Sequence, residues 1–103
     1  MPKIIPSKLS RTERKKMKTL LCEKIAKFKF GKDVSNFLDD LLTESEFVML
    51  TRRLKIAKML IEGATYFEIK KKLKTSHQTI RFVREKINLG DGGFYKFVKQ
   101  IKI

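Results

Sequence analysis

A group of polar side chains in the second half of the chain has the chemistry needed to hydrogen-bond to base pairs. His77, Gln78 and Arg81 lie within five positions of one another, at the start of a segment whose apolar spacing predicts a helix. A glutamine amide can bond twice to the edge of adenine, and an arginine guanidinium twice to the edge of guanine. We therefore predict that these three residues contact bases, with Arg81 first. The alternative is that they are ordinary polar residues of a first helical turn.

A second group of side chains is suited to phosphates, which position a protein on DNA without specifying sequence. Most of its members are basic, and they flank the first group in the sequence. Thr79 could meet either a phosphate or a thymine methyl group. A solvated basic face is the alternative interpretation of the whole group. The candidates for phosphate contacts are Lys70, Lys71, Lys72, Lys74, Thr79 and Arg84.

Two short helices must position these side chains. Thr65 is followed three residues later by Glu68, which is the pattern of a capping box and predicts a helix that starts near Tyr66. Ser76 can cap a second helix, and only three residues, 74–76, separate the two. Apolar residues recur at helical spacing on one face of each helix, and these are Ile69, Leu73, Ile80, Val83 and Ile87. Residues 65–87 thus have the pattern of a helix-turn-helix.

Charge favours a nucleic-acid partner over simple packing. The chain of 103 residues has 25 Lys and Arg against 11 Asp and Glu, a net charge of +14. Residues 65–87 hold seven basic and two acidic groups, residues 1–32 hold eleven and two, and residues 33–64 hold four and six. A central segment that builds the core and flanking segments that face a polyanion explain this partition. We expect residues 1–9 to form a flexible basic arm and residues 10–103 a single helical domain.

Composition gives little support to catalysis or to metal binding. The chain has one His and one Cys, and it lacks a glycine-rich phosphate loop, so we expect no enzyme activity, no metal site and no cofactor. Cys22 is expected to be a small core residue. No run of 18 apolar residues exists, and the first ten residues lack the hydrophobic block of a signal peptide. We therefore expect a cytoplasmic protein that does not enter a membrane.

The remaining sequence predicts helices and no strand. A capping box of Ser10 and Glu13 opens a helix that we place over about 11–29 and expect Gly31 to stop. Asp33 is expected to cap a short second helix. Further along the chain we expect a long helix that begins after Thr43, a stop at Gly63, and a loop of glycines before a terminal aromatic helix that docks on the core through Phe94, Tyr95, Phe97, Val98 and Ile101.

Two apolar stripes are wider than one short partner helix requires. The first lies on the helix over 11–29 and the second on the long helix before Gly63. Their surplus predicts burial against a second subunit, with a compact monomer as the alternative. The residues of the first stripe are Met17, Leu20, Leu21, Ile25 and Phe28, and those of the second are Phe47, Leu50, Leu54, Ala57 and Ile61.

The run LLTESEFVMLTRRLKIAKMLIEGATYFEIKKKLKTSHQTIRFV resembles the Trp repressor superfamily, especially the small Trp-repressor-like regulators of the YerC/YecD type. The resemblance covers about residues 37–90, and the closing stretch NLGDGGFYKF is similar to the tail of the YerC-type branch. It implies an intertwined all-α homodimer whose two recognition helices enter successive major grooves of DNA, a docking for which Trp repressor is a standard example.

Several positions depart from the family pattern. Tryptophan-responsive repressors hold the indole of the corepressor between two arginines; Arg53 matches the first, but Phe82 stands in place of the second and Val83 in place of the glycine after it. The resemblance therefore implies a closed or reshaped pocket and no tryptophan-dependent switch. Lys70 replaces a usually small residue, and Lys74 replaces the usual turn glycine, where a left-handed backbone costs a lysine about 1 kcal/mol.

These observations lead to one predicted function. We expect a sequence-specific regulator that binds double-stranded DNA through a helix-turn-helix, acts as a repressor and does not use tryptophan as corepressor. The effector, if one exists near Arg53 and Phe82, is not identified by the sequence. A basic RNA-binding module and a protein-interaction module are the alternatives, although the chain shows no signature of an RNA-binding fold.

Overall fold

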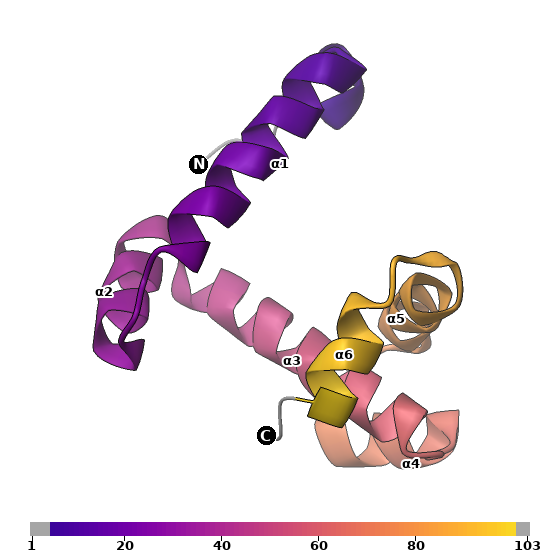
Figure 1. Cartoon of the computed structure of the whole chain (residues 1–103). Helices are drawn as coiled ribbons and strands as arrows, with labels where there is room; N and C mark the ends of the chain where they lie inside the picture. Colours follow the sequence, from indigo (N-terminus) through magenta and orange to yellow (C-terminus); the bar gives the residue numbers. More distant parts are fainter. Residues whose placement is uncertain (1–4, 101–103) are drawn as a thin grey trace. The chain divides into compact units, whose positions relative to one another are not determined.

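The computed structural model describes residues 5–100, with side chains described as far as residue 99 (Figure 1). Within these residues the chain folds only into helices, which confirms the all-α class. A short 3-10 helix precedes six α-helices. The elements are η1 (Pro6–Lys8), α1 (Arg11–Ala26), α2 (Gly31–Leu41), α3 (Glu44–Ile61), α4 (Tyr66–Leu73), α5 (His77–Leu89) and α6 (Gly93–Gln100).

The chain is divided into two compact units, Met1–Leu42 and Thr43–Ile103. The single domain over residues 10–103 stays a prediction, and so does the flexible arm over 1–9. Residues 1–4 of that arm lie outside the described residues, whereas Pro6–Lys8 forms the 3-10 turn η1. The predicted helix-turn-helix at 65–87 falls entirely within the second unit.

The first unit begins as the sequence predicts and then departs from the prediction. Ser10 and Glu13 form the expected capping box, because the Ser10 hydroxyl accepts a bond from the Glu13 amide at 3.0 Å. However, α1 ends at Ala26, three residues before the predicted end. The ring of Phe28 lies 5.1 Å from that of Phe37 in α2. Phe28 lies in the connection after α1, so this aromatic contact packs the connection against α2.

Gly31 and Asp33 do not have the roles that we predicted for them. Gly31 is the first residue of α2 and does not stop α1, and Phe30 occupies the N-cap position without a side-chain bond. Asp33 lies inside the first turn of α2, where a carboxylate interacts favourably with the positive end of the helix dipole. The prediction of an Asp33 cap was therefore wrong, because the helix starts two residues before it.

Neither helix of the first unit buries a residue within this chain. The predicted apolar stripe of α1 is exposed, with Met17 at 55% and Leu20 at 56% of their maximal accessible area. Cys22 is exposed as well, so the expectation that it is a core residue was wrong for the single chain. Exposed apolar residues that share one helix face are typical of interaction surfaces.

The second unit is organised by the long helix α3. Thr43 and Glu46 cap its start as predicted, since the Thr43 amide donates to Glu46 at 2.8 Å and the Thr43 hydroxyl accepts from the Glu46 amide at 3.2 Å. The helix stops just before Gly63, whose φ of +95° is in the left-handed region that favours glycine. The chain then enters α4 after two residues.

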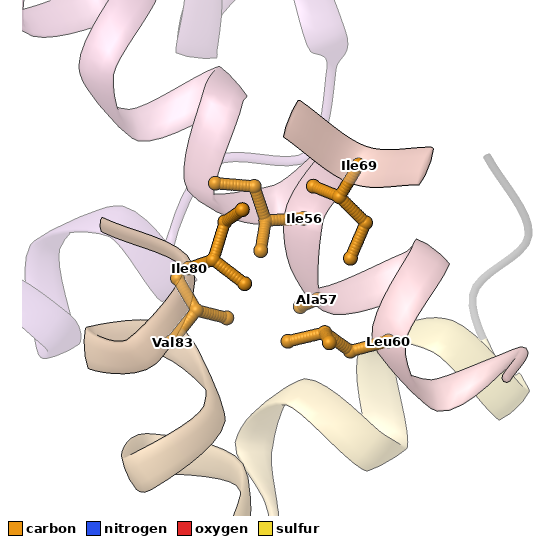
Figure 2. Close-up of a cluster of buried hydrophobic side chains, with 6 residues drawn as sticks. All are labelled: Ile56, Ala57, Leu60, Ile69, Ile80 and Val83. Atoms are coloured by element: carbon orange, nitrogen blue, oxygen red, sulfur yellow. The ribbon is translucent and has the colours of Figure 1, made fainter. Parts of the chain in front are cut away.

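The core of the second unit lies where α3, α4 and α5 meet (Figure 2). Helix α3 contributes three of its side chains, and the two short helices contribute the other three. Phe94 of α6 packs against this cluster from one side, as predicted for the terminal helix, while Tyr95 remains half exposed. Ile101 lies outside the described residues. The six buried side chains are Ile56, Ala57, Leu60, Ile69, Ile80 and Val83.

We expect the capping box of α4 to make the stability of this unit depend on pH. The Glu68 carboxylate accepts bonds from the Thr65 amide at 3.0 Å and from the Thr65 hydroxyl at 2.9 Å, and these bonds lower the pKa of Glu68 below its usual value of 4.5. A lowered pKa means that the stabilisation is complete above the unfolded value and is lost as pH falls through the folded one.

We expect the variant Glu68→Gln to remove part of this acid sensitivity. Glutamine can still accept the capping bonds, but it does not titrate. Between about pH 5 and pH 3, the melting temperature of the variant should therefore fall less than that of the wild type. Thermal melts followed by circular dichroism across that range measure the difference. Parallel curves for the two proteins would show that the Glu68 bonds do not stabilise the fold.

No helix among the described residues is long and apolar enough to cross a membrane.

Candidate nucleic-acid interface

The predicted helix-turn-helix is present in the second unit. Helix α4 ends at Leu73, residues 74–76 form the turn, and α5 starts at His77. The hydroxyl of Ser76 accepts a bond from the Thr79 amide at 3.1 Å, so Ser76 caps α5 as expected. Ile69 from the first of these helices and Ile80 from the second are fully buried in the shared core. The two helices are therefore held in a fixed relation by their apolar faces.

The three candidates for base contacts are all exposed on α5. His77, Gln78 and Arg81 point away from the core, since Ile80 and Val83 of the same helix are fully buried. Gln78 and Arg81 have no described partner that would compete with a ligand at their exposed ends. His77 differs, because its ring lies 4.9 Å from that of Tyr66 in α4. The two rings are tilted by 55°, so His77 makes an aromatic contact with α4 while it stays exposed.

Four candidate phosphate ligands are exposed lysines. Lys70, Lys71 and Lys72 occupy the last turn of α4, where cations also interact favourably with the negative end of the helix dipole. Lys70 replaces a usually small residue and keeps its side chain in solvent, as its long aliphatic stem allows. Lys74 follows in the turn. The structure thus places these four cations directly before α5.

Two other candidates for phosphate contacts are engaged within the protein. The Thr79 hydroxyl is 2.9 Å from that of Ser76, so it supports the cap of α5. The Arg84 guanidinium lies over the ring of Tyr66 at 5.4 Å, and its Nε is buried without a hydrogen-bond partner. Contacts of Thr79 and Arg84 with DNA stay predictions, and both side chains also contribute to the fold.

The backbone of Lys74 is strained, as the sequence predicted. Its φ of 50° and ψ of 45° are left-handed, and it is the one residue other than glycine with positive φ in the part of the chain that the structure describes. The Lys74 amide donates to the Lys70 carbonyl at 3.0 Å, which closes α4. A lysine at a position that favours glycine gives up some stability.

Phe82 occupies the space beside Arg53. The Arg53 guanidinium lies 4.8 Å from the centre of the Phe82 ring, and the Lys86 ammonium lies 5.5 Å from it. These are cation–π distances. Arg53 belongs to α3 and Phe82 to α5, so the contact links these two helices. Val83, at the position of the family's glycine, is fully buried in the core.

The sequence interpretation missed a group of basic residues on α3. Arg52 lines two adjacent surface cavities, one of about 450 Å³ shared with Lys55 and Lys72, and one of about 300 Å³ shared with Arg53 and Lys74. The signal was present as an Arg-Arg pair followed by a lysine three positions after Arg52. Only the structure shows that this face of α3 adjoins the end of α4 and the turn.

A metal centre has no ligand set in the residues that the structure describes, since no three His, Cys, Asp or Glu side chains gather there.

Comparisons with known proteins identify a family and a solved structure that are similar to this chain. The family model of the Trp repressor protein matches residues 16–102, a wider span than the residues 37–90 that carry the resemblance in the sequence. The uncharacterised protein YerC of Bacillus subtilis is 36% identical over 66 residues, which are 64% of this chain and 64% of YerC. The matched part of this chain thus spans less than two thirds of YerC.

A solved structure shares the fold. It is the crystal structure of a Staphylococcus aureus protein provisionally assigned as a Trp repressor, and it superposes with a TM-score of 0.70 at 27% identity. The similarity covers 90% of this chain and 89% of the other.

Proposed function

From the premise that the chain belongs to the Trp repressor protein family, we propose that it is a sequence-specific regulator of transcription that binds double-stranded DNA. The family is one of regulatory DNA-binding folds and not of enzymes. We further propose that the protein acts as a repressor, binds as a homodimer and requires no metal or cofactor. Because its proposed partner is chromosomal DNA, we expect it to act in the cytoplasm.

One observation carries the proposal. Helix α5 buries Ile80 and Val83 completely and exposes Gln78 and Arg81 on its other side. A recognition helix needs both properties, since its apolar face must fix it to the scaffold while its polar face enters the major groove. Gln78 and Arg81 have the geometry for bidentate bonds to adenine and guanine, and His77 beside them completes the proposed base-contacting set.

The proposed phosphate contacts come from the lysines before α5, with Thr79 and Arg84 as further ligands. Lys70, Lys71 and Lys72 are exposed at the end of α4, and they carry no sequence information by themselves. Their contribution should therefore be equal for every duplex and should depend on salt, because each neutralised phosphate releases condensed counterions.

We expect Lys71→Gln and Lys72→Gln to weaken binding to all duplexes alike. Each substitution should reduce the slope of log K against log salt by about 0.9. Fluorescence anisotropy with several unrelated duplexes over a salt series measures both the slope and its uniformity. Thr12→Gln, on the exposed surface of α1, is a control that leaves the charge unchanged. If the slope stays at the wild-type value in both lysine variants, these lysines do not contact phosphates.

The same salt series separates the proposed function from the alternatives. Single-stranded RNA and polyglutamate serve as competing polyanions. A preference for particular duplexes that persists at high salt supports direct readout of bases, whereas equal loss of binding to every polyanion supports a nonspecific basic surface. Stronger binding to RNA than to any duplex would favour an RNA-binding module.

We propose that tryptophan is not a corepressor of this protein. The Phe82 ring packs against Arg53 at 4.8 Å, so the space beside that arginine already holds an aromatic group from α5. The recognition helix is then fixed to α3 without a ligand. DNA affinity measured with and without millimolar tryptophan should be the same, and a tryptophan-dependent increase would contradict this proposal.

The proposed homodimer would cover the exposed apolar residues of α1 and α3. Leu20 of α1 is 56% exposed, and Val48 and Leu50 of α3 are 51% and 45% exposed. Burial of such side chains is the main favourable term in most protein association. The intertwined arrangement of the family is the geometry that we propose for it.

A charge at this surface should convert the dimer to a monomer. We expect Leu20→Glu to shift the sedimentation coefficient to that of one chain, because the carboxylate would lose its hydration in an apolar interface. Thr19→Glu, which adds the same charge beside it at an exposed polar position of α1, is the matched control and should leave the dimer intact. A wild-type protein that sediments as a monomer at micromolar concentration would contradict the proposal.

A further inference from the structure

We propose that the cavity beside the turn of the helix-turn-helix is a binding site for a phosphoryl group. The cavity has a volume of about 300 Å³ and lies between α3 and the start of α5. The occupant is either a phosphate of the DNA backbone or the phosphate of a small phosphorylated compound. The inference rests on the proposed function only if the occupant is a phosphate of the DNA backbone. The lining residues are Met49, Arg52, Arg53, Lys74, Thr75, Ser76 and Thr79.

Three cations from two separate elements meet at this cavity. Arg52 and Arg53 come from α3, and Lys74 comes from the turn. No acidic residue lines the cavity, and within residues 5–99 the only ion pair joins Lys58 to Glu62, so none of the three cations is neutralised inside the described part of the protein. Uncompensated cations at such close quarters repel one another, and an anion between them removes that repulsion.

Thr75 adds a hydroxyl group to the wall of the cavity. Thr75 is only 6% exposed and is the one buried polar residue of the described chain, yet it lines the cavity. The side-chain hydrogen bonds of the turn join Ser76 to Thr79, and neither of them uses the Thr75 hydroxyl. A hydroxyl group can donate a hydrogen bond to a phosphoryl oxygen bound in the cavity.

The start of α5 adds a favourable potential. Ser76 is the N-cap of α5 and Thr79 lies in its first turn, and both residues line the cavity. Helix α5 has 13 residues, so its N-terminus carries a positive partial charge. This partial charge and the three cations around one cavity favour an anion there.

The left-handed backbone of Lys74 fits the same conclusion. Glycine would be favoured at this φ of 50°, and a lysine there holds a cation at the cavity at the expense of backbone strain. The loss of backbone stability at Lys74 is explained if its ammonium group binds a phosphoryl group in the cavity. The variant Lys74→Gly should therefore fold at least as stably as the wild type while it binds the phosphoryl group less tightly.

Binding of inorganic phosphate and pyrophosphate to the protein alone is the first arm of the test. Backbone amide spectra recorded against sodium chloride of equal ionic strength should show saturable shifts at residues 74–79. Thr75→Val removes the hydroxyl but keeps the shape, and Arg52→Gln removes one cation; each should weaken binding by about tenfold, as expected for bonds to a charged group. Lys96→Gln removes an exposed cation of α6 that neither lines this cavity nor belongs to the proposed DNA contacts, and it should leave phosphate binding unchanged.

The second arm uses duplex DNA and the same variants. If the occupant is a backbone phosphate, Arg52→Gln should lower the salt slope by about 0.9. An unchanged slope together with phosphate binding at residues 74–79 assigns the site to a free phosphorylated compound. The proposal is overturned if neither phosphate nor duplex binding responds to Arg52→Gln and Thr75→Val. Should the protein fail to bind any duplex, the first arm still decides whether the cavity takes a phosphoryl group.

Discussion

Replacing Ile80 by alanine is expected to destabilise the second unit by about 2–5 kcal/mol. Ile80 is fully buried between α3, α4 and α5, so the substitution removes three carbon atoms from the centre of the core and leaves a cavity (Figure 2). Unfolding by urea, followed by circular dichroism, measures the loss. A loss of this size is a large part of the stability of a small domain.

The control for this prediction is Ile80→Val, which removes one methylene and should cost only about 0.5–1.5 kcal/mol. DNA affinity should fall together with stability in the alanine variant, because α5 is held to its scaffold through this side chain. A destabilisation below about 0.5 kcal/mol in Ile80→Ala would mean that α5 does not pack as described.

Replacing Arg81 by alanine is expected to change the sequence preference of DNA binding and to leave the stability of the fold almost unchanged. Arg81 is the next residue along α5, but it is exposed, so the free energy of unfolding should change by no more than about 0.5 kcal/mol. The preference for the matched base at one position of the site should fall by about 1–3 kcal/mol, the value of a good bidentate contact. Competition binding between the best duplex and its single-base variants measures this preference.

Lys71→Gln is the charge-matched control for Arg81→Ala. Both variants lose one positive charge, but Lys71 is placed among the phosphate ligands, so its variant should weaken all duplexes equally. If Arg81→Ala keeps the full sequence preference, then another residue reads that base and the orientation proposed for α5 in the groove is wrong.

Local signals in the sequence were sufficient to predict most helix starts. The capping boxes at Ser10, Thr43 and Thr65 all form, since each depends on two residues three positions apart and on little else. Gly63 and Lys74 end their helices with positive φ, as their positions in the pattern indicated. The helix-turn-helix followed from these local signals together with the apolar spacing of α4 and α5.

Features that depend on distant contacts were not predictable in the same way. Gly31 resembled a helix stop, but α1 ends earlier, Phe28 of the connection packs against Phe37, and Gly31 begins α2. Cys22 is likewise exposed because no described helix of its own unit covers it. The apolar stripe around Cys22 does not show in the sequence whether a second helix covers that stripe.

In the candidate site, too, the residues that depend on distant contacts could not be predicted from the sequence. Its exposed side chains could be assigned from α4 and α5 alone, whereas the contribution of Arg52 depends on how the middle of α3 adjoins the turn. The contact between Arg53 and Phe82 also joins residues that lie 29 positions apart, and only the resemblance to a family brought those two positions together in advance.

Selection of bound sequences from a library of random duplexes tests the central claim most directly. At a salt concentration that suppresses nonspecific binding, the wild-type protein should enrich one pseudo-palindromic motif whose half-sites are about one helical turn, or 10–10.5 base pairs, apart. Arg81→Ala should lose the enrichment of one base in each half-site. Recovery of an unenriched library by the wild-type protein would contradict the proposal that this chain reads DNA sequence.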